Sequence, residues 1–182
     1  MGLDMYLNKK HYVQNWSFQA PEEQHEVIVK KGGEVVKHIN PSRINYVEEQ
    51  VMYWRKFNAL HAWFVENVQG GVDECQVSYV SRIQLEDLLA VLRKVESSLE
   101  ASAKTKQKIR IGYNADGEMF DEIDVFEDTS VAEDLFPTQE GFFFGGTEYD
   151  DYYLQQVKET ITMLEAELEV EDGGDYLYHA SW

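Results

Sequence analysis

Four side chains between positions 54 and 61 have the types and the spacing that a small active site could use. Trp54, Asn58 and His61 recur every three or four residues, so on a helix they would share one face, with Arg55 beside it. A histidine near a polar amide can act as a general base or as a ligand. The competing interpretation is a core histidine whose ring nitrogens are satisfied by hydrogen bonds. The residue types alone leave both interpretations open.

The other motifs that suggest chemistry are incomplete. Cys75 is the single cysteine, which permits no internal disulfide and no cysteine-based zinc cluster. We expect it to be a small buried residue, with a catalytic thiolate as the alternative. Residues 114–117, Asn-Ala-Asp-Gly, resemble part of a calcium loop, but Gly112 and Ile123 stand at the first and last ligand positions, where oxygen ligands are needed. We therefore predict no metal site and no cofactor, although the acidic clusters that follow could gather a divalent cation loosely.

A glycine-rich stretch at 141–146 precedes a predicted helix and could in principle cradle a phosphate. The first turn of that helix already carries Glu148, Asp150 and Asp151. These carboxylates match the helix dipole and would repel a phosphate, so ordinary helix capping is the favoured interpretation.

Acidic residues are strongly concentrated in the C-terminal part of the sequence. Residues 111–182 carry twenty carboxylates and one basic residue, Lys158, whereas residues 1–110 carry fourteen acidic and fifteen basic residues. Such a field repels nucleic acids and anionic membranes and attracts basic proteins. A concentrated anionic surface can also imitate nucleic-acid phosphates and enter a channel lined by Lys and Arg. The competing interpretation is a solvated surface that keeps the protein soluble.

We expect the partner-binding carboxylates to lie in two short segments and to form one continuous patch. They are Asp121, Glu122, Asp124, Glu127, Asp128, Glu148, Asp150 and Asp151.

The bulk composition is that of a folded protein. The chain has 182 residues, 43% of them hydrophobic, with 11 Tyr, 9 Phe and 4 Trp, so a single domain over 1–182 with a real core is expected. An acidic disordered tail would be poor in aromatic residues. No apolar stretch approaches the roughly 20 residues that span a bilayer, so we expect a soluble, cytoplasmic protein.

Strands are predicted at both ends of the chain, at 5–13 and 176–182, and we expect them to pair with each other. Between them, 14–43 is irregular, with a small hairpin around Gly32-Gly33 and a capped proline at Asn40-Pro41. The apolar spacing over 46–68 predicts one long helix that stops at Gly70-Gly71.

Three further elements are predicted after that stop. A capping box at Ser81 and Gln84 opens a second helix. Residues 101–108 are expected to be a basic linker, followed by a hairpin over 109–125 with its turn at Asp116-Gly117. A third helix begins near Asp150. The fold class predicted is α+β, with a small, largely antiparallel sheet that includes both termini and packs against about three helices.

Three sequence stretches together resemble a known group of proteins. They are Met-Gly-Leu-Asp-Met-Tyr-Leu at 1–7, the 53–64 stretch with Tyr-Trp-Arg-Lys, Asn58, His61 and Trp-Phe, and the 136–150 stretch with Phe-Pro-Thr, Gly-Phe-Phe-Phe-Gly and Thr-Glu-Tyr-Asp. This chain is similar to small proteins of bacteriophages and prophages, mostly without an assigned activity, so the resemblance implies no catalytic residue. It implies a phage accessory role, in which small acidic proteins that block CRISPR or restriction nucleases recur.

Two functional hypotheses follow. The leading one is an accessory protein that binds and inhibits a basic, nucleic-acid-handling protein, such as a nuclease, through its carboxylates, without contacting nucleic acid or membrane by that surface. The alternative is a small enzyme or ligand-binding domain with a pocket around Trp54, Asn58 and His61, and with Arg55 at its edge. The sequence fixes neither the oligomeric state nor a reaction.

Overall fold

The computed structural model describes residues 2–114, 117–141, 144–171 and 173–182, and it has an α+β fold. Four antiparallel strands form the main sheet: β1 (Asp4–Tyr12), β4 (Tyr46–Arg55), β5 (Ser78–Val80) and β8 (Asp175–Ser181). Their order is β4-β1-β8-β5. The first and last strands pair from Asp4↔Ser181 to Lys10↔Asp175, which confirms the prediction that both termini share the sheet.

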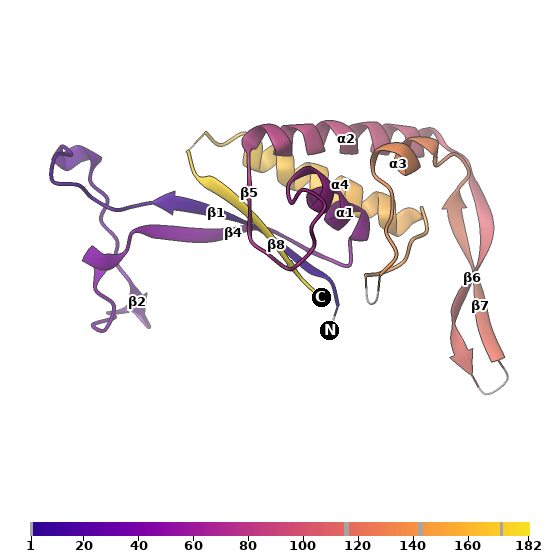
Figure 1. Cartoon of the computed structure of the whole chain (residues 1–182), viewed down its shortest axis with the longest axis horizontal. Helices are drawn as coiled ribbons and strands as arrows, with labels where there is room; N and C mark the ends of the chain where they lie inside the picture. The colour runs from indigo at the N-terminus through magenta and orange to yellow at the C-terminus, as the bar shows by residue number, and fades with distance from the viewer. Residues whose placement is uncertain (1, 115–116, 142–143, 172) are drawn as a thin grey trace.

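The helices lie on one face of this sheet (Figure 1). They are α1 (Asn58–Asn67), α2 (Arg82–Ala101), α3 (Ser130–Leu135) and α4 (Asp151–Leu168). Alternate residues of β1 and β8 point toward the helices, and the buried side chains Met5, Leu7, Tyr178 and Ala180 form the sheet's part of the core. Phe64 of α1 stacks on Tyr178, and α2 packs against α4.

Two helix starts confirm the predicted capping signals. Ser81 accepts a hydrogen bond from the backbone N–H of Gln84, whose side chain accepts from the N–H of Ser81, so the capping box is complete. Asp150 caps α4 by accepting from the N–H of Tyr153 at 2.9 Å. None of the helices in the described parts of the chain has the length and hydropathy needed to cross a membrane.

The long helix predicted over 46–68 is wrong in its first half. Residues 46–55 form β4, which pairs with β1 from Tyr46↔Tyr12 to Arg55↔Asp4, and the helix begins only at Asn58. The apolar spacing fits a helix, but the alternation of Met52 and Trp54 also fits a strand. Pairing with β1 makes this segment a strand. Lys56, with a φ of 55°, separates the strand from the helix. Ala59, in the first turn of α1, is buried.

The predicted linker at 101–108 is also wrong, since β6 (Lys104–Asn114) begins there and pairs with β7 (Gly117–Phe126). This confirms the hairpin but lengthens it. The register places Lys106 opposite Asp124, so basic residues that read as a linker have acidic cross-strand partners. The turn was predicted at Asp116-Gly117; residues 115–116 lie outside the described residues, and β7 begins at Gly117. The short elements α3 and β5 were not predicted.

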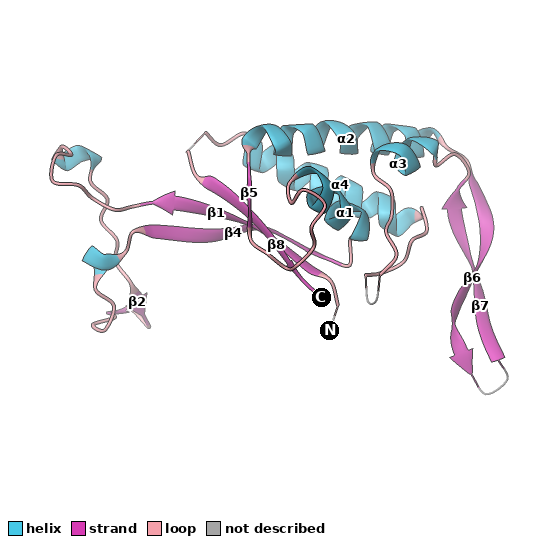
Figure 2. Cartoon of the chain, in the orientation of Figure 1, coloured by secondary structure: helices cyan, strands magenta, loops and turns pink. Residues whose placement is uncertain are grey.

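Two segments project from opposite ends of the body, as Figure 2 shows. One is the β6–β7 hairpin. The other, residues 13–45, is called the arm here; it extends the β1–β4 ribbon and contains the predicted small hairpin, β2 (Lys30–Lys31) and β3 (Glu34–Val35). Asn40 accepts a hydrogen bond from the N–H of Ser42, which confirms the predicted cap. None of residues 10–50 is buried, so the arm contributes nothing to the main core.

Candidate functional site

His61 is a buried core residue whose ring is held by hydrogen bonds at both nitrogens. Its Nδ1 lies 2.8 Å from the hydroxyl of Tyr178, and its Nε2 lies 2.9 Å from Oδ2 of Asp73. The side chain of His61 has 0% exposure, whereas that of Asp73 has 27%. Burial raises the pKa of Tyr178 well above its ordinary value, so the hydroxyl remains protonated at neutral pH. Because the side chain of His61 is fully buried, a substrate in solvent has no path to the imidazole.

Asn58 clamps the loop that precedes α4. Its Oδ1 accepts a hydrogen bond from the N–H of Gln139 at 3.0 Å, and its Nδ2 donates to the carbonyl of Gly146 at 2.7 Å. A longer bond of 3.4 Å reaches the carbonyl of Phe144, whose ring packs edge-on against His61. Two of the three resembling stretches, 53–64 and 136–150, therefore contact each other, and their polar side chains hold the loop in place. Phe142 and Phe143 lie outside the described residues.

Trp54 and Arg55 do not complete a pocket with these residues. The indole of Trp54 is 5% exposed and donates to Oγ1 of Thr160 at 2.9 Å. Arg55 points to the opposite face of the sheet, where its Nε lies 3.8 Å from Asp4. Sequence reasoning placed all four side chains on one helix, but two lie on a strand and two on a helix. Because Trp54, Asn58 and His61 have their polar atoms occupied, the geometry favours a structural role for them.

The carboxylates of the β6–β7 hairpin lie beside basic side chains of its first strand. Asp124 forms an ion pair with Lys106 at 2.9 Å, and Glu122 lies opposite Lys108. Glu118 similarly pairs with Arg110. Asp121 is on the other face of the hairpin, opposite Ile109. The hairpin is therefore a mixed surface, and the basic residues of 104–110 reduce the field that its carboxylates produce.

The remaining predicted carboxylates gather where the hairpin meets the start of α4. Val125 bridges to Asp150 there, and Lys104 forms an ion pair with Asp151 at 2.6 Å. Several of these groups also have local structural roles. Asp128 accepts bonds from the hydroxyl and the N–H of Ser130, which lower its pKa. Asp150 caps α4, and Glu148 accepts from the N–H of Thr147.

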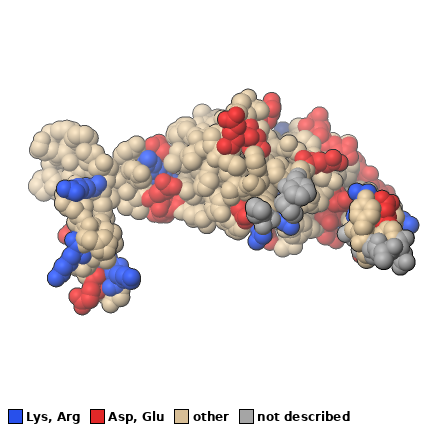
Figure 3. Space-filling view, turned by 60° about the horizontal axis from the view of Figure 1, so that its bottom comes forward, with Lys and Arg blue, Asp and Glu red and all other residues tan. Residues whose placement is uncertain are grey.

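The structure thus brings the two acidic segments to one end of the molecule, but with intervening Lys and Arg. Acidic side chains also spread over the central body, and basic side chains are prominent on the arm (Figure 3). The sequence has 34 Asp and Glu against 16 Lys and Arg. Even if each basic side chain neutralised one carboxylate, 18 would be left, so the surface as a whole remains anionic.

Sequence reasoning missed a partly exposed aromatic row on the sheet face opposite the helices. Tyr6 stacks on His179 with ring centroids 4.7 Å apart, and Tyr53 lies on its other side at 5.3 Å. These residues are cross-strand neighbours in β4, β1 and β8. The alternating side chains of 5–13 and 176–182 indicated two of the three strands that carry this row. The third was missed because 46–68 was predicted to be a helix.

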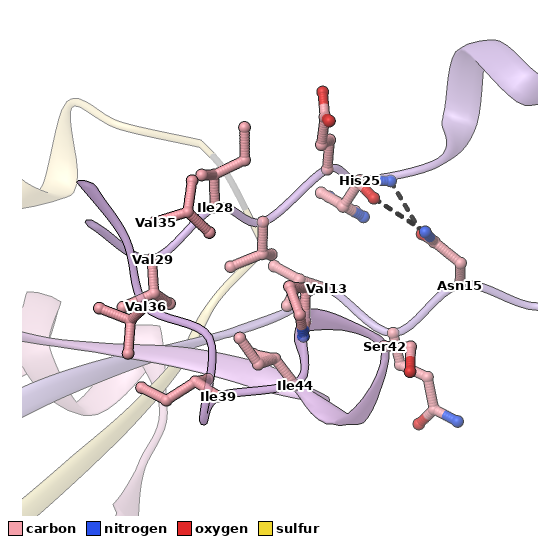
Figure 4. A pocket seen from close by; sticks show the side chains of 14 residues that line it. Val13, Asn15, His25, Ile28, Val29, Val35, Val36, Ile39, Ser42 and Ile44 are labelled. Atoms are coloured by element: carbon pink, nitrogen blue, oxygen red, sulfur yellow. Dashed lines mark hydrogen bonds between the residues drawn. The ribbon is translucent and has the colours of Figure 1, made fainter. Parts of the chain in front are cut away.

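Several surface hollows have volumes of about 390–600 Å³, and two of them adjoin features described above. One, of about 580 Å³, lies in the arm and is lined mostly by the aliphatic side chains of Val13, Val29, Val36 and Ile44 (Figure 4). The side-chain amide of Asn15, bonded to the backbone of His25, lies at its border. The other, of about 530 Å³, is a groove between β4 and α4. Within the described ranges, no three His, Cys, Asp or Glu side chains are arranged to hold a metal ion.

Cys75 is exposed and not buried as expected, and it adopts a φ of 56° in the loop between α1 and β5.

Comparison of this chain with protein-family models, with curated proteins and with solved structures finds no match.

Proposed function

We propose that this protein is a binding protein that acts on a basic, nucleic-acid-handling protein and inhibits it through electrostatic attraction. The observation that carries the proposal is the formal charge of -18, which internal ion pairs cannot remove because basic residues are too few. A charge of this size speeds encounters with a cationic surface and competes with nucleic acid for the same Lys and Arg side chains. A phage accessory protein directed against a CRISPR or restriction nuclease is the setting that we propose.

The enzyme alternative receives less support. A general base must reach its substrate, and the imidazole of His61 is enclosed by Tyr178, Asp73 and Phe144. Asn58 has both ends of its amide bonded to the backbone of the loop before α4. A catalytic role would require these bonds to break, which would release the loop.

The test is affinity capture from a bacterial lysate, followed by assay of the purified captured protein. Capture at about 50 mM salt should recover a basic nucleic-acid-binding protein and should fail at about 500 mM, because salt screens exposed charges. The purified partner should lose nuclease activity when this protein is added. Recovery of only acidic or neutral proteins, or a captured nuclease with unchanged activity, would refute the proposal.

The structure also suggests which charge reversals to use. Asp150 caps α4, and Asp128 accepts two bonds from Ser130 at the start of α3, so reversing them would confound a loss of binding with a loss of stability. Asp121, Glu122 and Glu127 are exposed and cap no helix. The triple change of these three to Lys should weaken capture more than a matched triple change on the arm, at Glu22, Glu26 and Glu34, which alters the net charge equally.

A further inference from the structure

We propose that the outer edge of β4, together with the groove between β4 and α4, binds an extended segment of the partner in which basic and apolar residues alternate. The segment would join the sheet as an additional antiparallel or parallel strand beside β4. This inference rests on the proposed function and adds the mode of recognition. It depends on three features of the described residues: a free strand edge, an adjoining groove and the local charge.

The free edge follows from the sheet order, because β4 ends the sheet and its only described strand neighbour is β1. In an antiparallel ladder, successive residues direct their N–H and C=O groups alternately toward and away from the neighbouring strand. The N–H of Lys56 bonds to the carbonyl of Leu3. Counting back from this bond, the backbone N–H and C=O groups of Met52 and Trp54 face β1, whereas those of Tyr53 and Arg55 face away from the sheet.

The outward groups are available for a new strand. The carbonyl of Arg55 accepts a bond of 3.3 Å from the side chain of Gln156, which can rotate away. The backbone of Tyr53 has no bond to described residues beyond the sheet. Toward the arm, the N–H of Val13 bonds to the carbonyl of Asn45, and the same alternation turns Glu48 and Gln50 outward. An unpaired edge of this kind is a template for strand addition.

The groove of about 530 Å³ begins at this edge. Tyr53 and Trp54 form its β4 side, and α4 contributes Tyr152, Thr162 and Met163. Side chains of an added strand would alternate between two environments, since successive residues point to opposite faces. One set would enter the groove over Trp54 and Met163. The other would lie against the aromatic row that begins at Tyr53 on the open face of the sheet.

The charge beside the edge selects a basic segment. Glu159 stands exposed on the α4 wall of the groove, and Glu48 and Glu49 are exposed farther along β4. Arg55 borders the mouth of the groove, but its side chain turns toward the open face of the sheet and lies near Asp4. A second copy of this chain is a poorer occupant, because it would bring another formal charge of -18 to the same surface. We therefore assign the edge to an extended basic segment of a different protein.

The experiment uses a peptide of about eight residues in which lysine and valine alternate, long enough to span the edge and the groove. Amide exchange measured by NMR gives the decisive readout. On binding, the N–H groups of Tyr53 and Arg55 should exchange about tenfold more slowly, whereas those of Met52 and Trp54, already bonded to β1, should not change. Equal effects at all four positions, or none, would overturn the assignment.

Matched variants on α4 distinguish peptide binding in the groove from general electrostatic attraction to the protein. Thr162→Trp fills the groove and should weaken peptide binding about tenfold, whereas Ala166→Trp, on the exposed surface one turn away, should not. Glu159→Lys should weaken binding more than Glu169→Lys, although both change the charge equally.

The failure of this inference can be told from failure of the proposed function. An all-lysine peptide that binds as tightly as the alternating one, with equal losses in Glu159→Lys and Glu169→Lys, would overturn strand addition while leaving electrostatic binding intact. Protection of Tyr53 that rises with protein concentration in the absence of peptide would show self-association at the edge and would also overturn it.

Discussion

Replacement of Asn58 by Ala should destabilise the protein substantially, because it removes the clamp on the loop before α4. Asn58 is 3% exposed and makes two bonds of 2.7 and 3.0 Å to the backbone of Gly146 and Gln139. The substitution removes both bonds. Since Gly146 and Gln139 are themselves exposed, water can take up part of each lost bond, so each is worth about 0.5–1.5 kcal/mol. We expect a loss of about 1–3 kcal/mol, which for a domain of this size lowers Tm by roughly 2–12 °C.

Urea and thermal unfolding followed by circular dichroism would measure this loss, and amide exchange at Gln139 would locate it. Asn67→Ala is the matched control, since Asn67 lies at the end of the same helix, is exposed and makes one bond, to the carbonyl of Trp63. It should cost less than about 1 kcal/mol. If Asn58→Ala were no more destabilising than this control, the clamp would not hold the loop.

Asn58→Asp adds a test of the donor half of the clamp. The carboxylate can still accept from Gln139, but at neutral pH it faces the carbonyl oxygens of Gly146 and Phe144 without a proton to donate. Its folded-state pKa is therefore raised, and the penalty is present above the unfolded pKa and is relieved as pH falls. The stability gap to the wild type should narrow from pH 7 to pH 4. A gap that stays constant would contradict the assigned geometry.

Four further outcomes follow from the charges and burial described above. Tm at pH 7 should rise as ionic strength increases from about 10 to about 200 mM, because the charge of -18 repels itself; a falling Tm in differential scanning calorimetry would mean that attractive pairs dominate. The pKa of Asp128 is lowered by Ser130, so its stabilisation is present above its ordinary pKa of 3.8 and is lost below it; Asp128→Asn should flatten the acid limb of the stability curve. Burial raises the pKa of Tyr178 and Tyr153, so stability should hold below pH 10 and fall above it, and Tyr178→Phe should reduce this alkaline slope measured in urea. Replacing arm residues 13–45 by a short Gly-Asn-rich turn should change the free energy of unfolding of the body, measured in urea, by no more than about 0.5 kcal/mol, because none of these residues is buried. Collapse of the sheet would show that the arm supports it.

The sequence predicted those parts of the fold that local signals specify. The capping box at Ser81, the cap at Asp150 and the paired terminal strands all have short-range or strongly patterned signals, and the structure confirms them. Residues 46–55 failed because the apolar positions fit both a helix and a strand. The choice is made by β1, which lies more than thirty residues away in sequence and supplies the hydrogen-bonding partner.

In the candidate sites too, features with a local sequence signal were predicted, and features set by tertiary packing were not. The burial of His61 was weighed correctly as an alternative, but its partners Asp73 and Tyr178 are brought to it by tertiary packing and have no local signal. The acidic segments were found from composition, whereas their neutralisation by Lys104 and Lys106 required the hairpin register. The groove beside β4 was not visible, because it exists only once 46–55 is a strand and α4 lies against it.

The most direct test of the binding function is displacement of labelled duplex DNA from the captured basic partner by this protein. We expect full displacement at low salt, with an apparent affinity that falls steeply as salt increases. The triple change at Asp121, Glu122 and Glu127 should weaken this affinity more than the matched triple change on the arm. A partner that binds this protein and keeps its DNA, or an affinity that does not depend on salt, would contradict it.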